Sequence, residues 1–307
     1  MLRHKNNFIG DTWYYVNEDT VHCYYLTCPT TIERHTAWDI GHAVSTDLIN
    51  WSDHQIVLKK GKFGEWDDTC LATGSVIKHD GRFWMAYTAK WDKPDVAVGI
   101  AVSDDLYHWE KIGNRPMTQI DDRYYERTGS GSRPISHWRD PFLFSHEGYI
   151  YHAVCASKNT GPIDSRGTVG LARTKNFLSW EVIPPPEIEE VAAELECPQL
   201  HVCGDKYLLV FSSSYELFSQ EMQVKYGKSG LPHSAYAMWS NSIFGPYHFS
   251  YQKPLIPKHY PVKPYAIQVV NFKGNTYLMG TVWDFEHDND FVTNPIPVTC
   301  DGEKFIV

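Results

Sequence analysis

Residues 74–90 read GSVIKHDGRFWMAYTAK, two segments rich in aromatic and apolar residues that flank the turn Asp80-Gly81. Such segments on either side of a short turn with glycine predict a β-hairpin. The pattern recurs at a spacing of about sixty residues, which indicates an internal repeat. The five copies are residues 10–26 (GDTWYYVNEDTVHCYYL), 74–90, 139–157 (RDPFLFSHEGYIYHAVCAS), 196–214 (ECPQLHVCGDKYLLVFSSS) and 266–283 (AIQVVNFKGNTYLMGTVW).

A second element follows four of the hairpins and consists of a further strand, a polar turn and an aromatic residue. Its copies are residues 43–51 (AVSTDLINW), 101–109 (AVSDDLYHW), 171–180 (LARTKNFLSW) and, more loosely, 237–247 (AMWSNSIFGPY). A hairpin with one or two further strands makes a blade, and five blades close into a ring around a channel. The sequence therefore predicts an all-β fold, a five-bladed β-propeller, with residues 1–307 as a single domain.

The connecting segments show little regular periodicity. Residues 187–195 (EIEEVAAEL) are the one short helix candidate and are expected to link two blades. Residues 128–133 (TGSGSR) and 221–230 are expected to form long loops at the rim.

The charge balance narrows the possible partners. The chain has 37 acidic and 28 basic side chains and no basic run, which argues against nucleic acid or a membrane surface as a partner. No apolar stretch is long enough for a signal peptide or a membrane span, so we expect a cytoplasmic protein unless a leader has been removed. The seven cysteines form no CxxC pair, and their odd number predicts reduced, mostly buried thiols.

Carboxylates occupy the start of the first strand in three of the five repeats. These residues are Asp11, Asp140 and Glu196, whereas the other two repeats have Gly74-Ser75 and Ala266 near that place. Because the innermost strands of a propeller line its channel, the three acids are expected to converge at one end of it. Crowded carboxylates repel one another, and glycoside hydrolysis requires such a group: a carboxylic acid facing an opposing carboxylate.

Several motifs at these residues resemble family 32 of the glycoside hydrolases, the invertases and fructanases, and more distantly family 43, the arabinanases and xylosidases. The motifs are Arg139-Asp140-Pro141, Glu196-Cys197, residues 41–51 (GHAVSTDLINW), Thr73-Gly74-Ser75-Val76, and Tyr265-Ala266-Ile267-Gln268 with Gly280 and Trp283. The resemblance implies that Asp11 is the nucleophile, Glu196 the acid/base and Asp140 the transition-state stabiliser in a retaining double displacement. Two features differ: residues 8–13 (FIGDTW) replace the WMNDPNG motif, and we expect no C-terminal β-sandwich, because the chain stops at Val307.

Further candidate binding residues surround the three acids. Trp38 and Asp39, and Trp66, Asp67 and Asp68, precede strands at the mouth of the expected channel, where rings stack on sugars and acids bind hydroxyls. Packing of these tryptophans between blades remains an equal alternative. The resemblance adds Thr73, Arg139, Tyr265, Gln268 and Trp283. We expect no metal or cofactor, since no zinc spacing occurs and residues 284–290 (DFEHDND) lack the glycine and glutamate of an EF-hand.

The combined prediction is a hydrolase of furanosides, a β-fructofuranosidase or fructan hydrolase acting on an oligo- or polysaccharide. Two alternatives stay open: an arabinofuranosidase or xylosidase of the family 43 type, and a non-catalytic carbohydrate-binding propeller. The latter would be indicated if a salt bridge tied off one of the catalytic carboxyls. For Glu196 to begin as the acid, its pKa should be raised while Asp11 stays ionised. Sugar, linkage, exo or endo action and oligomeric state are not set by the sequence.

Overall fold

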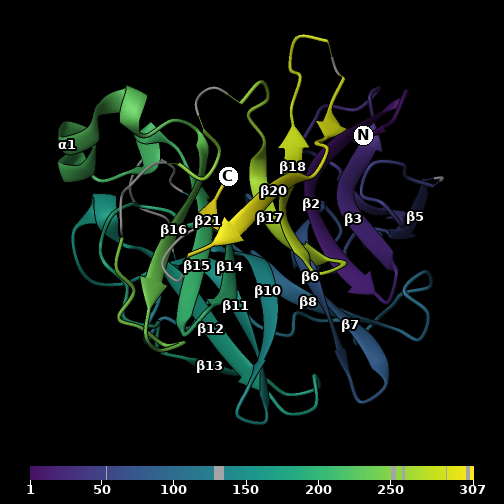
Figure 1. The fold of residues 1–307 in the computed structure, drawn as a ribbon. Coiled ribbons are helices and arrows are strands. Elements are labelled where there is room, and N and C mark those ends of the chain that lie inside the picture. Colours follow the sequence, from purple (N-terminus) through teal and green to yellow (C-terminus); the bar gives the residue numbers. More distant parts are fainter. Residues whose placement is uncertain (53, 128–134, 250–253, 258–259, 288, 302–304) are drawn as a thin grey trace.

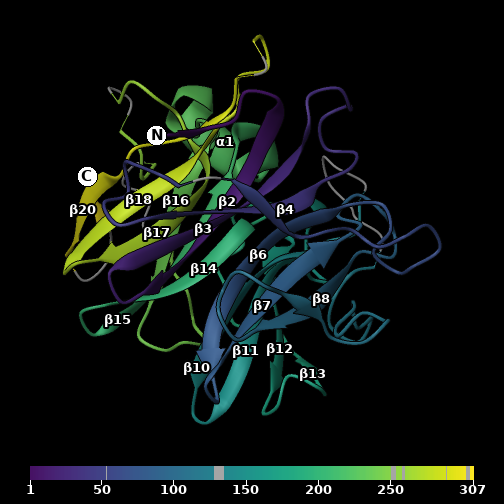
Figure 2. The same ribbon diagram turned by 90° about the vertical axis from the view of Figure 1, so that its right-hand side faces the viewer.

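A computed structural model describes residues 1–307 except 53, 128–134, 250–253, 258–259, 288 and 302–304. Five antiparallel sheets follow one another along the chain, and their first strands lie next to each other in a closed ring (Figure 1 and Figure 2). This arrangement is the predicted five-bladed β-propeller. The predicted loop at residues 128–133 lies outside the described residues.

The first three blades have four strands each, and each blade begins with its innermost strand. Blade one contains β2 (Asn7–Asn17), β3 (Thr20–Pro29), β4 (Asp39–Ser45) and β5 (Gln55–Leu58). Blade two contains β6 (Leu71–His79), β7 (Arg82–Ala89), β8 (Ala97–Ser103) and β9 (Glu110–Lys111). Blade three contains β10 (Trp138–His146), β11 (Tyr149–Ser157), β12 (Gly167–Thr174) and β13 (Glu181–Ile183).

The last two blades depart from the four-stranded pattern within the described residues. Blade four has three strands, β14 (Glu196–Cys203), β15 (Lys206–Ser213) and β16 (Ser234–Ser240). Blade five contains β17 (Tyr265–Phe272), β18 (Asn275–Val282), β19 (Phe291–Val292), β20 (Ile296–Cys300) and β21 (Phe305–Ile306). The N-terminal strand β1 (Leu2–Arg3) joins this last sheet.

The hydrophobic core is divided among the interfaces between blades. Five clusters of buried side chains each draw residues from two neighbouring blades, for example Trp13 with Met85 and Tyr87 between blades one and two. The alternating strand pattern explains this division, because each sheet presents apolar side chains on both faces to the next blade. The aromatic residues seen in the sequence are therefore largely the material of these interfaces.

The ring closes between blades five and one. Strand β1 pairs antiparallel with β19, with Leu2 opposite Val292. Beside it, the Thr281 hydroxyl donates to the Gly10 carbonyl at 2.6 Å, and the Ile9 amide donates to Asp290 at 3.3 Å. The ends of the described chain thus fasten the first innermost strand to the last blade.

The repeated polar turn after the third strand has the same hydrogen bonds in three blades. Ser45, Ser103 and Thr174 each accept a backbone N–H three residues later, at 2.9, 2.9 and 3.1 Å. The residues that donate are Leu48, Leu106 and Phe177, all buried and all with positive φ. The repeat predicts the polar turn, but the side chain that the turn buries is Leu48, Leu106 or Phe177 and not the aromatic residue that ends the repeat.

Two local predictions are wrong. Residues 187–195 are not helical but extended, because their backbone bonds outward: Glu189 N–H to the Tyr247 carbonyl, and Ala193 N–H to the Leu217 carbonyl. The predicted loop at residues 221–230 is instead the helix α1 (Gln220–Gly230), which Ser219 caps by accepting from the Met222 amide. Short 3-10 turns at η1 (Ile163–Ser165) and η2 (Tyr215–Leu217) complete the described helical structure.

The cysteines correct the expectation that all thiols are reduced. Cys203 in β14 and Cys300 in β20 form a disulfide that links blades four and five. The other five cysteines are free and buried. A disulfide is typical of oxidising compartments, and the cytoplasmic location stays a prediction. No helix in the described residues is long and apolar enough to cross a membrane.

Candidate active site

A pocket of about 500 Å³ lies where the innermost strands begin. It brings together eight of the thirteen residues predicted for the site. They are Asp11, Trp38, Thr73, Arg139, Asp140, Glu196, Tyr265 and Trp283. The convergence of the three acids at one end of the channel is therefore found in the structure.

A β-bulge at the pocket end of every innermost strand positions these side chains. The register against the second strand slips by one residue at Ile9/Thr12, Ala72/Gly74, Arg139/Phe142, Glu196/Gln199 and Tyr265/Gln268. Bulges redirect side chains beside active sites. The predicted equivalence of the acids holds only at the level of the bulge, because Asp140 and Glu196 occupy different places within it.

The bulges of blades three, four and five contain a residue in the left-handed region. These residues are Asp140 (φ 61°), Cys197 (φ 48°) and Ala266 (φ 48°). A left-handed conformation costs a residue other than glycine about 1–3 kcal/mol and recurs at functional sites. Asp140 has this conformation itself, whereas Glu196 immediately precedes the residue that has it.

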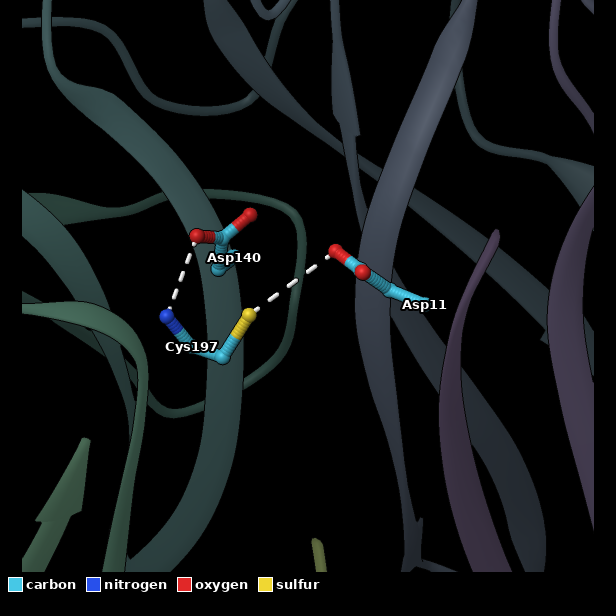
Figure 3. Close-up of side chains that lie close together, drawn as sticks. All are labelled: Asp11, Asp140 and Cys197. Atoms are coloured by element: carbon cyan, nitrogen blue, oxygen red, sulfur yellow. Dashed lines mark hydrogen bonds between the residues drawn. The ribbon is translucent and has the colours of Figure 1, made fainter. Parts of the chain in front are cut away.

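Asp11 and Asp140 face each other across Cys197 (Figure 3). The Thr73 hydroxyl donates to Asp11 Oδ2 at 2.5 Å, and the Cys197 thiol lies 3.8 Å from the same oxygen. The Cys197 amide donates to Asp140 Oδ2 at 3.1 Å. One residue of the fourth blade therefore fixes the carboxyls of the first and the third.

Glu196 is held by a cation on one oxygen and by a phenol on the other. Arg139 Nη2 donates to Glu196 Oε1 at 2.8 Å, and the Tyr265 hydroxyl donates to Glu196 Oε2. Arg139 Nη2 also donates to Glu194 Oε2 at 2.6 Å, and Arg139 Nε lies 3.7 Å from Asp140. The buried guanidinium of Arg139 thus lies within ion-pair distance of three carboxylates.

Burial changes the protonation of the acids. Desolvation, together with the charge of Asp140, raises the pKa of Asp11 to about 7. Burial also raises the pKa of Asp140, and the charge of Arg139 opposes that rise. The expectation that Asp11 stays ionised is therefore not supported near neutral pH, because burial raises its pKa to about 7.

The pH profile of catalysis should report this carboxyl. If ionised Asp11 is the nucleophile, kcat/KM should rise with pH through about 7. The Thr73 hydrogen bond lowers the pKa of Asp11, so Thr73→Val should move the acidic limb of the profile upward by about one pH unit. The matched control is Thr168→Val, which alters a buried threonine of β12 outside the pocket. An unmoved limb in Thr73→Val would show that another group controls it.

Two further walls of the pocket were not predicted from the sequence. On one side His35 and Trp91 join Trp38 and Trp283, with the His35 ring 5.3 Å from Trp283 and 5.5 Å from Trp38. On the other side the segment between β15 and β16 contributes four lining residues: Ser214, Glu216, Leu217 and His233. No sequence motif marks these loop residues, so only the fold reveals them.

Five predicted binding residues lie outside the pocket lining. Asp39 accepts the amide of Lys60, 21 residues later, at 2.8 Å, and Asp68 accepts the Gly64 amide within its own turn at 2.8 Å, so both carboxylates hold backbone segments in place. Trp66 stacks on the Tyr87 ring at 6.1 Å and packs against the cluster between blades one and two, which is the alternative of packing between blades. Gln268 is buried in β17 beyond the bulge. Asp67 is also buried and pairs with Lys111 at 2.5 Å.

Asp11, Asp140 and Cys197 also place three potential metal-ligating atoms within 4.8 Å of one another. Burial, with the charge of Asp140 beside it, raises the pKa of the Cys197 thiol well above its usual range. In the structure the amide of Cys197 donates to Asp140 and its thiol contacts Asp11, so this residue already bridges the two carboxyls. We therefore assign the cluster to positioning of the carboxyls.

A five-bladed propeller with three carboxyls at one end of its channel is the architecture of a class of glycoside hydrolases. The chain belongs to glycosyl hydrolase family 32, since the model of the family 32 N-terminal domain matches residues 6–253. The resemblance seen in the sequence is confirmed by this match.

Individual relatives are distant. The chain is 24% identical to sucrose-6-phosphate hydrolase of Bacillus subtilis over 182 residues, and 25% identical to raffinose invertase of Escherichia coli over 183 residues. Each match covers 56% of this chain and 34% of the relative, so the chain matches about a third of the length of these proteins.

Solved structures share the fold along nearly the whole chain. The β-fructofuranosidase BmSUC1 of Bombyx mori superposes with a TM-score of 0.70 at 17% identity, covering 99% of this chain and 64% of that one. Levansucrase of Bacillus subtilis superposes with a TM-score of 0.73 at 15% identity, covering 98% and 86%.

Proposed function

We propose that this protein hydrolyses β-fructofuranosides with retention of configuration. The observation that carries the proposal is the meeting of Asp11, Asp140 and Glu196 in one pocket, with Thr73 on the first and Arg139 and Tyr265 on the last. Two carboxyl groups with different partners are what a double displacement needs. The names of the relatives, sucrose-6-phosphate hydrolase and raffinose invertase, support a fructoside as substrate.

The first step forms a covalent intermediate. A carboxylate oxygen of Asp11 attacks the anomeric carbon of the fructosyl unit, and the bond to the leaving oxygen breaks. Glu196 gives its proton to that oxygen. Asp140 accepts hydrogen bonds from ring hydroxyls and stabilises the positive charge that develops on the ring.

The second step releases the sugar. Glu196, now ionised, takes a proton from water, and the water oxygen attacks the anomeric carbon. The bond to Asp11 breaks, which restores its carboxylate and leaves Glu196 protonated for the next cycle. The hydrogen bond from Thr73 stabilises Asp11 whenever it is ionised.

One contact favours a second candidate, a non-catalytic carbohydrate-binding propeller. The salt bridge between Arg139 and Glu196, 2.8 Å long, is the kind of contact that would tie off the general acid. Against this, the same Nη2 of Arg139 is shared with Glu194 at 2.6 Å. Activity measurements separate the two candidates.

The test compares wild type with Glu196→Gln on sucrose, inulin, levan, arabinan and aryl furanosides. We expect wild type to release fructose from at least one fructoside, and Glu196→Gln to lower kcat by about 10²–10⁴-fold, the usual contribution of a general acid. The matched control is Glu190→Gln, an acid paired with Lys158 outside the pocket. Release of arabinose alone would mean that the activity is of the family 43 type and not that of a fructosidase. Binding of a sugar without cleavage would favour the non-catalytic propeller.

A further inference from the structure

Glu194 is a fully buried carboxylate that the proposed reaction does not use. It is 0% exposed and lies in the extended connector just before β14, two residues ahead of Glu196. It does not line the pocket. A buried carboxylate needs compensating partners, because its loss of hydration is costly.

Glu194 contacts basic side chains of blade three and of the residues that lead into it. Arg139 Nη2 donates to Glu194 Oε2 at 2.6 Å, and His137 Nε2 lies 3.4 Å from Glu194 Oε1. The same Arg139 Nη2 donates to Glu196 Oε1 at 2.8 Å. Glu194 and Glu196 therefore compete for one nitrogen of one cation.

This competition has a chemical consequence for the general acid. If Arg139 faced Glu196 alone in a buried site, it would strongly favour the ionised form of Glu196. A carboxyl that is always ionised cannot protonate a leaving group. A second anion on the same guanidinium weakens that bias, and the negative charge of Glu194 near Glu196 opposes ionisation as well.

We propose that Glu194 is a positioning residue that divides the charge of Arg139 and so keeps Glu196 able to carry a proton. The inference rests on the proposed function, in which Glu196 is the general acid. Glu194 acts through Arg139 and touches neither the pocket nor the reacting atoms. It also supplies the buried charge that fixes the orientation of the Arg139 side chain.

The titratable and charged groups around Glu196 come from several elements, and all remain in place when Glu194 changes. They are Arg139 and Asp140 of β10, Cys155 of β11, Asp11 of β2, Cys197 of β14, Tyr265 of β17, and the loop residues His137, His233 and Glu216. A shift of the pH profile in Glu194→Gln can therefore be attributed to Glu194 by comparison with control variants in which these groups are also unchanged.

The first experiment measures the pH dependence of kcat and KM on the best fructoside. Glu194→Gln keeps the shape of the side chain and removes its charge, so the basic limb of the profile should move to lower pH by about one unit. Above that limb kcat should fall about tenfold while KM changes little. Glu194→Asp, which keeps the charge, should restore much of the wild-type profile. Asp67→Asn, which removes another buried ion-pair carboxylate, should leave the limb unmoved.

The second experiment needs no activity. Thermal unfolding is measured for Glu194→Gln, Glu196→Gln and the double variant at alkaline pH, where Glu196 is ionised in the wild type. If the two acids share Arg139, either single change also relieves repulsion between them, so the double variant should lower Tm by more than the sum of the singles. Arg139 remains in all three proteins.

The outcomes separate this inference from the proposed function. An unmoved basic limb in a folded Glu194→Gln protein, or additive Tm changes, would overturn the role of Glu194. An inactive wild type with non-additive Tm changes would overturn the proposed hydrolase function and the role of Glu194 in catalysis. It would still show that Glu194 and Glu196 share Arg139. A shifted limb, rescue by Glu194→Asp and non-additive Tm changes together are the expected result.

Discussion

Asp11→Asn is expected to lower kcat/KM on a fructoside by about 10⁴-fold or more, because the variant lacks the oxygen nucleophile of the first step. The same change should stabilise the fold at high pH. The pKa of Asp11 is raised from 3.8 to about 7 by burial, so the folded state resists ionisation of this group. The contribution of Asp11 to the free energy of unfolding is therefore fully present below pH 3.8 and is lost as the pH rises through about 7.

The size of this gain follows from the shift. Three pKa units correspond to at most about 4 kcal/mol in the free energy of unfolding. Asp11→Asn should therefore be more stable than wild type at pH 8, with the difference vanishing near pH 4, as urea denaturation at both values can show. Equal stability at pH 8 would mean that ionised Asp11 is well solvated. Retained hydrolysis would remove it as the nucleophile.

Arg139→Met is expected to destabilise the protein by about 3–5 kcal/mol at pH 7, the usual cost of removing one partner from a buried ion pair. Arg139 is 3% exposed and is the cation within 3.7 Å of Asp140, Glu194 and Glu196. Methionine keeps the volume but leaves three buried carboxylates without this charge. The loss should shrink as pH falls, since protonated carboxyls no longer need the cation.

Urea denaturation between pH 4 and pH 8 checks this expectation. The control is Arg173→Met, which breaks an exposed pair with Glu181 of the same type, 2.8 Å long, and should cost less than about 1 kcal/mol. If Arg139→Met also lowers the free energy of unfolding by less than about 1 kcal/mol at pH 7, the guanidinium does not hold the carboxyls together. If the variant cannot be recovered at neutral pH, refolding at pH 4 should rescue it.

The fold was predictable because its signals are local and repeated. Alternating apolar residues and glycine turns define each hairpin, and the polar turn at Ser45, Ser103 and Thr174 marks each third strand in turn. The acid trio was predictable for the same reason, since its members lie at the bulges near the pocket ends of the innermost strands. Positions within a bulge were not, because the slip in register is decided by pairing across the sheet.

The missed and misplaced residues lie in connectors. Glu194 lies within residues 187–195, which look helical in sequence, yet the amides of Glu189 and Ala193 donate to the carbonyls of Tyr247 and Leu217, which are distant in the chain. Asp68 looked like a ligand for sugar hydroxyls, but it accepts the Gly64 amide within its own turn. Side-chain chemistry alone does not tell a carboxylate that faces a pocket from one that closes a loop.

The closure of the ring has a consequence for how the protein folds. The backbone just before Asp11 is held by Thr281 and Asp290, residues about 270–280 positions later in the chain. Contacts of such high sequence separation form late and make folding slow. The nucleophile should therefore reach its final position only when the fifth blade docks, so hydrolytic competence should arise in a single late event and not grow blade by blade.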